Sequence, residues 1–154
     1  MKVDKLSKRS LMLLKAALVL IAILTFTWLI LFPQTEGRNA NSDSLSLYFN
    51  DPFLVYVYLG AIPFFVIIFQ TLKLLSYIED NRIFALSVLK ALKIVKYCSV
   101  ISVYFIIGAV VILIMGPEDD KPPIIGIGTL LITFHIFIAA AANLFQKIIK
   151  RRIN

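Results

Sequence analysis

The stretch Ser76 to Lys96, SYIEDNRIFALSVLKALKIVK, determines how the rest of the chain is arranged, because membrane-length apolar segments lie on both sides of it. Basic side chains outnumber acidic ones in and just before this stretch, which favours the cytoplasmic side of a membrane. They are Lys73, Arg82, Lys90, Lys93 and Lys96, against Glu79 and Asp80. We therefore interpret the stretch as a cytoplasmic connection between two membrane hairpins.

The composition of the chain is that of a membrane protein. Of its 154 residues 60% are hydrophobic and only 16% are charged, and the mean hydropathy is +0.89, which is too apolar for a soluble domain of this length. The net charge is +7, but the basic residues flank apolar segments. This placement favours an anionic lipid surface over nucleic acid, so we expect a lipid bilayer as the partner and no direct nucleic-acid binding.

Four apolar segments are long enough to cross a bilayer, at residues of about 11–32, 52–75, 95–115 and 123–145. At ~1.5 Å per helical residue, each one spans most or all of a ~30 Å hydrocarbon core. A cleavable signal peptide is the alternative for the first segment, but its apolar region would be shorter, and no small-x-small pattern follows Phe32. Asn50 or Asp51, followed by Pro52, predicts a helix start, and Gly116-Pro117 predicts a helix end. The acidic turn at residues 118–121 is so short that the helices on either side of it must be antiparallel neighbours.

The predicted fold is all-α. It is a single integral membrane domain over residues 1–154, a four-helix bundle made of two antiparallel hairpins joined by a cytoplasmic amphipathic segment. Of the 16 Lys and Arg residues, all but Arg38 and Lys121 fall on one predicted side. The positive-inside rule then predicts a multi-pass protein of the bacterial inner (plasma) membrane with both termini in the cytoplasm.

The second half of the Ser76–Lys96 stretch is amphipathic. On a helical wheel one side holds Phe84, Val88, Ala91, Leu92 and Val95, and an opposing arc holds Arg82, Lys90, Lys93 and Lys96. One interpretation is an interfacial helix whose lysines reach toward the lipid headgroups before the third span begins. The other is a docking surface for an acidic cytosolic partner, to which Lys150, Arg151 and Arg152 at the end of the chain would add.

His135 is the candidate for intramembrane chemistry, because it is the ionisable residue that lies deepest in a predicted span. Titratable groups in a bilayer are candidates for proton relays or ligand contacts. The competing interpretation is a neutral imidazole bonded to a hydroxyl or a backbone carbonyl of another helix. The second interpretation is favoured, since the spans hold no Asp or Glu to complete a relay. Gln70 is the other side chain that we assign to a candidate intramembrane polar site.

The remaining polar groups at membrane depth include Ser99, Ser102, Thr129, Thr133 and Asn143. Such groups usually join helices by hydrogen bonds of about 1 kcal/mol or less. Gly126, Gly128 and the alanines at 139–142 predict a surface on the fourth span that allows close packing, and Gly126-x-Gly128 lacks the other features of a nucleotide loop.

Catalytic chemistry has little support in the sequence. One histidine and the lone Cys98 cannot supply a metal-ligand cluster, and no serine motif with a plausible base is present. We therefore expect no enzyme activity, no metal and no cofactor.

The segment Leu74 to Val95, LLSYIEDNRIFALSVLKALKIV, resembles the central signature of a family of uncharacterised four-helix bacterial integral membrane proteins. Phe84 matches the phenylalanine of that signature, and Leu92 and Val95 match its later aliphatic positions. The sequence departs from it at Ala85, where the family usually has Ser, and at Val88, where a polar residue is common. The resemblance implies a four-span inner-membrane protein without an established activity. Members are often encoded beside small helix-turn-helix regulators, which implies a cytosolic regulator as partner.

Two functional hypotheses follow. The first is a membrane-embedded interaction or regulatory protein whose cytoplasmic surface is formed by the Ser76–Lys96 stretch and both basic ends. The second is a small transporter or channel subunit that uses His135 and a helix kink at Pro63. Because four helices line a pathway only with help, this second hypothesis expects a homo-oligomer or another subunit.

Overall fold

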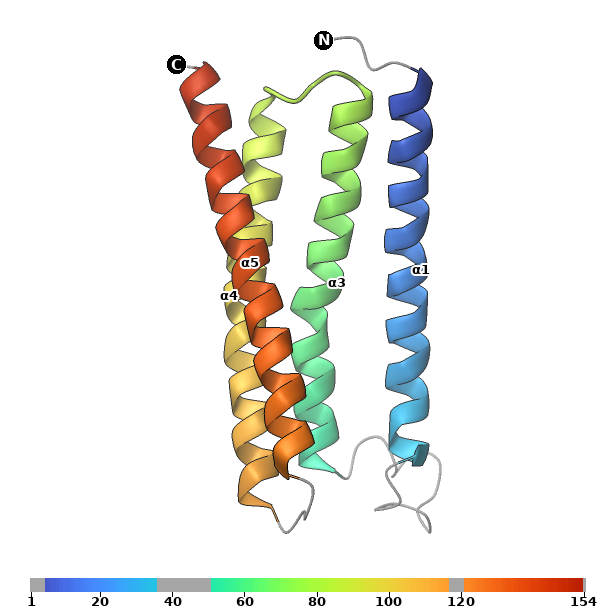
Figure 1. The fold of residues 1–154 in the computed structure, drawn as a ribbon, viewed down its shortest axis with the longest axis vertical. Helices are drawn as coiled ribbons and strands as arrows, with labels where there is room; N and C mark the ends of the chain where they lie inside the picture. The colour runs from blue at the N-terminus through green and yellow to red at the C-terminus, as the bar shows by residue number, and fades with distance from the viewer. Residues whose placement is uncertain (1–4, 36–50, 117–120, 154) are drawn as a thin grey trace.

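The computed structural model describes residues 5–35, 51–116 and 121–153. These residues form four helices, α1 (Lys5–Thr35), α3 (Pro52–Glu79), α4 (Leu86–Met115) and α5 (Lys121–Ile153), and the described ranges contain no strand. Each helix holds a segment that is long and apolar enough to cross a membrane. The predicted all-α, four-span architecture is therefore confirmed. The helices run up and down in chain order, so that the start of α1, the α3–α4 connection and the end of α5 lie at one end of the bundle (Figure 1).

The third helix begins earlier than predicted, because α4 starts at Leu86 and not near Val95. The amphipathic segment is thus the first part of a membrane-length helix and not a separate interfacial one. Val88, Leu92 and Val95 are buried, as the helical wheel predicts, but Phe84 precedes the helix and its side chain is 57% exposed. The sequence between Leu86 and Tyr97 holds no helix breaker, and the apolar side of this segment packs on neighbouring helices instead of lipid.

The other helices also extend past the predicted spans. The first continues through Pro33 to Thr35, and the second continues through the buried Pro63 to Glu79. Its start is as predicted: Asp51 is the N-cap, and its Oδ1 accepts a 2.9 Å hydrogen bond from the backbone N–H of Phe53. A carboxylate oxygen there satisfies one of the free donors of the first helical turn.

A tight polar turn separates α3 from α4. Asn81 has a φ of 58°, in the left-handed region that asparagine tolerates better than most residues. The N–H of Arg82 donates to the carbonyl of Tyr77 at 2.8 Å, and the N–H of Asn81 donates to Ile78 at 3.1 Å. This is the hydrogen-bond pattern of a Schellman motif, which satisfies the last carbonyls of α3 and reverses the chain.

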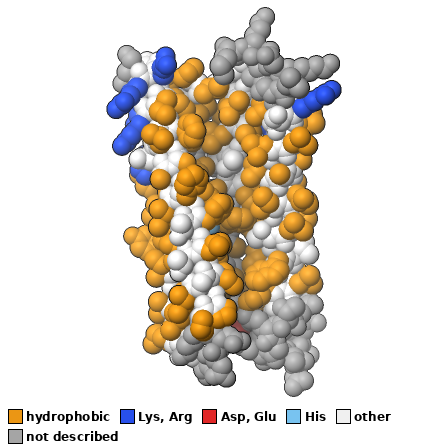
Figure 2. Space-filling model, in the orientation of Figure 1, with side chains coloured by type: hydrophobic (Ala, Val, Ile, Leu, Met, Phe, Trp, Pro, Cys, Tyr) orange, Lys and Arg blue, Asp and Glu red, His pale blue; other side chains and the backbone are white. Residues whose placement is uncertain are grey.

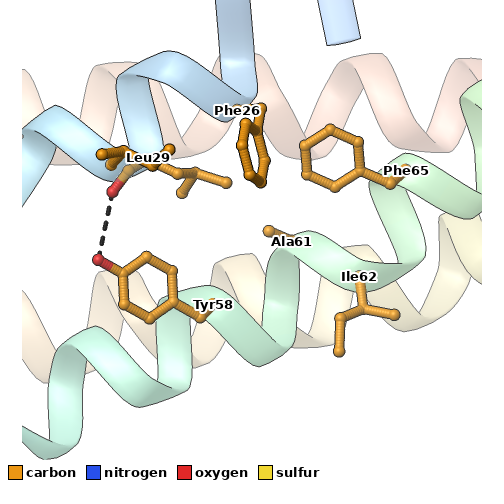
Figure 3. Close-up of a pocket in the computed structure, with 7 residues that line it drawn as sticks. Phe26, Leu29, Tyr58, Ala61, Ile62 and Phe65 are labelled. Carbon is orange, nitrogen blue, oxygen red and sulfur yellow. Dashed lines mark hydrogen bonds between the residues drawn. The ribbon is translucent and has the colours of Figure 1, made fainter. Parts of the chain in front are cut away.

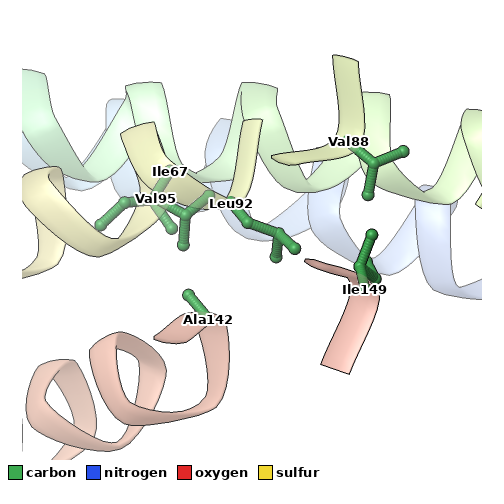
Figure 4. Packing of buried hydrophobic residues seen from close by; sticks show 6 residues of the cluster. All are labelled: Ile67, Val88, Leu92, Val95, Ala142 and Ile149. Atoms are coloured by element: carbon green, nitrogen blue, oxygen red, sulfur yellow. The ribbon is translucent and has the colours of Figure 1, made fainter. Parts of the chain in front are cut away.

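The buried core lies between α3, α4 and α5. It consists of Ile67 from α3, Val88, Leu92 and Val95 from α4, and Ala142 and Ile149 from α5 (Figure 4). The contact between α4 and α5 is the most extensive, and the contact between α3 and α4 is the next. The main contact of α1 is with α3, and it is smaller than either of these. The outer surface is covered by large apolar side chains (Figure 2), as expected where lipid replaces water around the helices.

Two polar contacts hold α1 against α3. The hydroxyl of Tyr58 donates to the carbonyl of Leu29 at 3.2 Å, and Lys15 Nζ lies 2.5 Å from Glu79 Oε2. A hollow of about 520 Å³ with an apolar lining borders the Tyr58–Leu29 contact, and Phe26 and Phe65 meet edge to face in its lining (Figure 3). The packing of α1 is therefore looser than that of the other three helices.

Candidate functional site

A cavity of about 540 Å³ lies among all four helices. Its lining is mostly apolar and includes Trp28 from α1, Phe64 from α3, Ile106 from α4 and Leu131 from α5. The molecule is hollowed between α5 and α1 on the face shown in Figure 2. The volume lies within the range of ~300–1,000 Å³ that is usual for small-molecule sites, so this cavity is large enough for a guest molecule.

His135 lines this cavity and is only 5% exposed. Its Nδ1 lies 2.9 Å from the carbonyl oxygen of Leu131, one turn earlier in the same helix. Because a carbonyl oxygen can only accept, Nδ1 must carry the hydrogen, which leaves Nε2 with a free lone pair in the neutral ring. The expected bond to another helix is therefore wrong: the backbone partner of the imidazole belongs to α5 itself.

Ser102 lines the same cavity from α4 and is 2% exposed. The neighbouring serine Ser99 donates to the carbonyl of Val95 at 2.8 Å, whereas the hydroxyl of Ser102 makes no hydrogen bond to the described residues. His135 Nε2 is the second buried polar atom that lacks such a partner among the described side chains. A buried polar atom left unsatisfied costs about 1–3 kcal/mol, so both atoms favour a hydrogen-bonding guest.

The two residues lie at the same height in the bundle. On α4, Ser102 lies between Lys96 and Val110. On the antiparallel α5, His135 lies between Asn143, which contacts Lys96, and Gly128, which contacts Val110. Lys96 Nζ donates to Asn143 Oδ1 at 3.1 Å, and Val110 packs on Gly128. The structure thus places a serine and a histidine that are far apart in the sequence at the same level of one cavity.

Gln70 does not join this pair. It is half-buried on α3, and it is absent from the residues that line the cavity. Of the two residues that we assigned to a candidate polar site, His135 lines the cavity and Gln70 does not. Ser102 takes the place of Gln70, although the sequence suggested for this serine only a role in joining helices.

Tyr56 forms part of the cavity wall and joins α3 to α4. Its hydroxyl donates to the carbonyl of Phe105 at 3.1 Å, and the two rings lie 5.1 Å apart. A Cβ atom at Gly108 would lie 2.1 Å from the tyrosine oxygen, so only glycine leaves room for this hydroxyl. The sign of this contact in the sequence is an isolated glycine, Gly108, within the apolar run of the third span.

The candidate docking residues lie at the end of the bundle that holds the α3–α4 connection and the end of α5. Their side chains are exposed except for Lys96, and they come from the α3–α4 turn, the start of α4 and the end of α5: Arg82, Lys90, Lys93, Lys150, Arg151 and Arg152. Lys and Arg side chains gather at this end of the molecule in Figure 2. The structure thus combines residues from two segments into one basic end.

Lys96 differs from the other basic residues of α4. It is half-buried, and its bond to Asn143 holds α4 against α5. Gln146 Nε2 adds a second link, a 3.3 Å hydrogen bond to the carbonyl of Leu89. Lys96 is therefore part of the packing between these helices. Lys90 and Lys93, which are exposed, are better placed to contact a docking partner.

The small and hydroxyl-bearing residues of α5 fall into two groups. Gly128 is buried against Val110, as predicted for a close-packing position, but a Cβ at Gly126 would meet nothing within 4 Å. Thr129 and Thr133 are exposed and bond to carbonyls of their own helix. The expectation of close packing at Gly126 is therefore wrong, as is that of helix-joining hydrogen bonds at Thr129 and Thr133. The hydrogen bond between helices expected of Asn143 is confirmed.

The fold and the apolar surface define a multi-pass α-helical membrane protein. More specifically, the chain belongs to the family described as "Protein of unknown function (DUF2975)", whose family model matches residues 38–154. A similar protein is the uncharacterized membrane protein YoaS of Bacillus subtilis (strain 168). It is 36% identical over 151 residues, which are 97% of this chain and 94% of the relative. No solved structure matches the chain.

Proposed function

We propose that the chain is an interaction protein of the bacterial inner membrane and not an enzyme, and that its basic end binds an acidic face of a cytosolic regulator. The observation that carries this proposal is the gathering of exposed Lys and Arg side chains from separate segments at one end of the bundle. Of the acidic residues at this end, Glu79 is already paired with Lys15. The excess positive charge is thus available to an anionic surface.

The orientation is the first part of the proposal to test. The positive-inside rule supports a cytoplasmic position for the basic end and both termini. In a Cys98→Ser background, single cysteines at Asn41, Asp119 and Asn154 should react differently with a membrane-impermeant maleimide. We expect the first two to react in intact cells and Asn154 only after permeabilisation; the reverse pattern would invert the topology and remove the docking hypothesis.

The proposed partner is a small helix-turn-helix regulator, which the family resemblance suggests. The test measures binding of such a purified regulator to the full chain in nanodiscs of neutral lipid. The double variant Lys90→Glu/Lys93→Glu should reduce the affinity at least about tenfold, because like charges at a contact cost several kcal/mol. Lys96 is left unchanged, since its replacement would disturb the bond to Asn143.

A second double variant tests the other segment of the basic end, and under the proposal it should also weaken regulator binding. Arg151→Glu/Arg152→Glu makes the same change in charge at the end of α5, where both side chains are also exposed. If the basic residues only hold lipid headgroups, both double variants should weaken binding to anionic vesicles equally and leave regulator binding unchanged. That result would overturn the proposed docking surface.

The transporter hypothesis gains no support. The central cavity is mostly apolar, whereas an ion pathway needs polar groups along its length. The family and the relative carry no transport activity in their descriptions. The apolar lining suits a different kind of guest.

A further inference from the structure

We propose that the central cavity binds an apolar molecule that carries a hydroxyl group, with the hydroxyl held between Ser102 and His135. The lining supplies the apolar environment, and these two side chains supply the polar atoms. The two side chains lie at the same height on α4 and α5, and the proposal places the hydroxyl of the guest between them. The site is independent of the basic end, which lies beyond the Lys96–Asn143 contact.

The chemistry of the two side chains selects the hydroxyl. The free lone pair of His135 Nε2 needs a donor, since Nδ1–H already donates to Leu131. The Ser102 hydroxyl can donate its hydrogen to an oxygen of the guest. An alcohol offers a donor and an acceptor on one atom, whereas an alkane offers neither. A carboxylate would bring an unpaired charge into an apolar cavity and could not donate to the imidazole.

Water is the simplest competing occupant. A buried water typically makes about three hydrogen bonds, but these two side chains offer only two and the rest of the lining is mostly apolar. A cavity of about 540 Å³ is also far larger than the ~30 Å³ that one water takes up. A guest with a long apolar body uses the whole space, so the arrangement favours an alcohol over water alone.

The bilayer is the expected route to the cavity. The lining includes residues of α1 and α5, while the main contact of α1 is with α3. Both polar atoms are almost fully covered in this structure. We therefore expect binding to turn the Ser102 hydroxyl about its Cα–Cβ bond and to rotate the imidazole slightly. The alcohol could come from a lipid with a free hydroxyl or from a free long-chain alcohol, and both share the recognised chemistry.

The experiment uses photoreactive probes with the full chain in nanodiscs. Hexadecanol carrying a mid-chain diazirine is compared with the matching hexadecane and hexadecanoic acid probes. Labelled residues are identified by mass spectrometry. We expect the alcohol to label cavity residues such as Phe64, Ile106 and Leu131 and to exceed both analogues. Competition by unlabelled hexadecanol and by a diacylglycerol, a lipid with a free hydroxyl, then shows which source binds better.

Variants separate the hydroxyl contact from the apolar cavity. Ser102→Ala and His135→Leu should each weaken alcohol labelling about fivefold, the loss expected for one hydrogen bond, and should not change alkane labelling. Ser99→Ala and Thr133→Ala are the controls, because these side chains bond to their own helix. Ala109→Phe should fill the cavity, which Ala109 lines, and abolish labelling by all probes.

The outcomes that overturn the proposal are specific. Equal labelling by the alcohol and alkane probes, with no effect of Ser102→Ala, would show that the cavity does not bind the hydroxyl group selectively. Labelling confined to the outer surface, or unchanged by Ala109→Phe, would show that the cavity takes no guest. Each variant is first checked for an unchanged melting temperature, and Ala61→Leu replaces Ala109→Phe if the latter does not fold. Because the experiment contains no regulator, its result is independent of the docking test.

Discussion

The α4–α5 seam and the α1–α3 seam are built differently, although both join antiparallel membrane-length helices. At the first seam, the Lys96–Asn143 hydrogen bond and the close contact of Gly128 with Val110 bring the helices together. At the second, a hollow of about 520 Å³ lies between the helices. The contact between α4 and α5 is correspondingly more extensive than that between α1 and α3.

This difference divides the molecule into a packed body of α3, α4 and α5 and a more loosely attached α1. The buried core is drawn from the first three, and the family model, at residues 38–154, covers these three helices and not α1. The loosely attached helix contributes Trp28 and its neighbours to the central cavity. Movement of α1 would therefore change access to Ser102 and His135 at little cost to the core.

The largest effect should come from filling the glycine contact of the tight seam. In Gly128→Leu a Cβ would lie 2.3 Å from Val110 Cγ2, and valine has few rotamers with which to yield. Overpacking of this kind costs about 1–3 kcal/mol, measured by reversible unfolding in mixed micelles. Gly126→Leu is the matched control, because a Cβ there meets nothing within 4 Å. Equal stability of the two variants would contradict close packing at this seam.

The next effect concerns the polar link of the same seam. Lys96→Met keeps an unbranched apolar stem but removes the hydrogen bond to Asn143, so the free energy of unfolding should fall by about 1 kcal/mol. Lys93→Met is the control, since Lys93 is exposed and should tolerate the change. A double-mutant cycle with Asn143→Ala tests the pairing directly, and strict additivity would show that the two side chains are not coupled.

The sequence predicted the parts of this architecture that depend on the solvent and on local capping. Four spans follow from the length of the apolar segments. The start of α3 follows from a capping residue, Asn50 or Asp51, before a proline, and in the structure Asp51 is the N-cap. The start of α4 was not predictable in this way. By hydropathy alone, the lysines at 90, 93 and 96 indicate a segment at the membrane surface. Hydropathy does not account for the burial of Val88 and Leu92 against other helices, which makes this segment part of α4.

The central site was predicted only in part. The position of His135 inside a long apolar segment marked it as a candidate, but the choice between a carbonyl of its own helix and one of another helix depends on its rotamer. Ser99 and Ser102 have the same chemistry and lie in the same apolar run. Only the packing of the helices shows that one is bonded to its own backbone and that the other lines a cavity beside the imidazole.

A smaller effect is expected at the loose seam. Tyr58→Phe removes the hydroxyl that donates to the Leu29 carbonyl, and hydrogen bonds between membrane helices average ~0.6 kcal/mol. The unfolding free energy should therefore change by less than for Lys96→Met. Tyr104→Phe, at a side chain that is 71% exposed, is the control. A loss larger than that of Lys96→Met would mean that α1 is held as firmly as α5.

The smallest effect should come from the ion pair at the end of the loose seam. The side chains of Lys15 and Glu79 are 28% and 40% exposed, and exposed ion pairs contribute little to stability because solvent screens them. A double-mutant cycle with Lys15→Met and Glu79→Gln should give a coupling energy smaller than the loss caused by Tyr58→Phe. Salt at about 1 M shortens the screening length to ~3 Å and should weaken the coupling further. Coupling that persists undiminished in such salt would place the pair in an environment shielded from water, and the contrast between the two seams would then rest on packing alone.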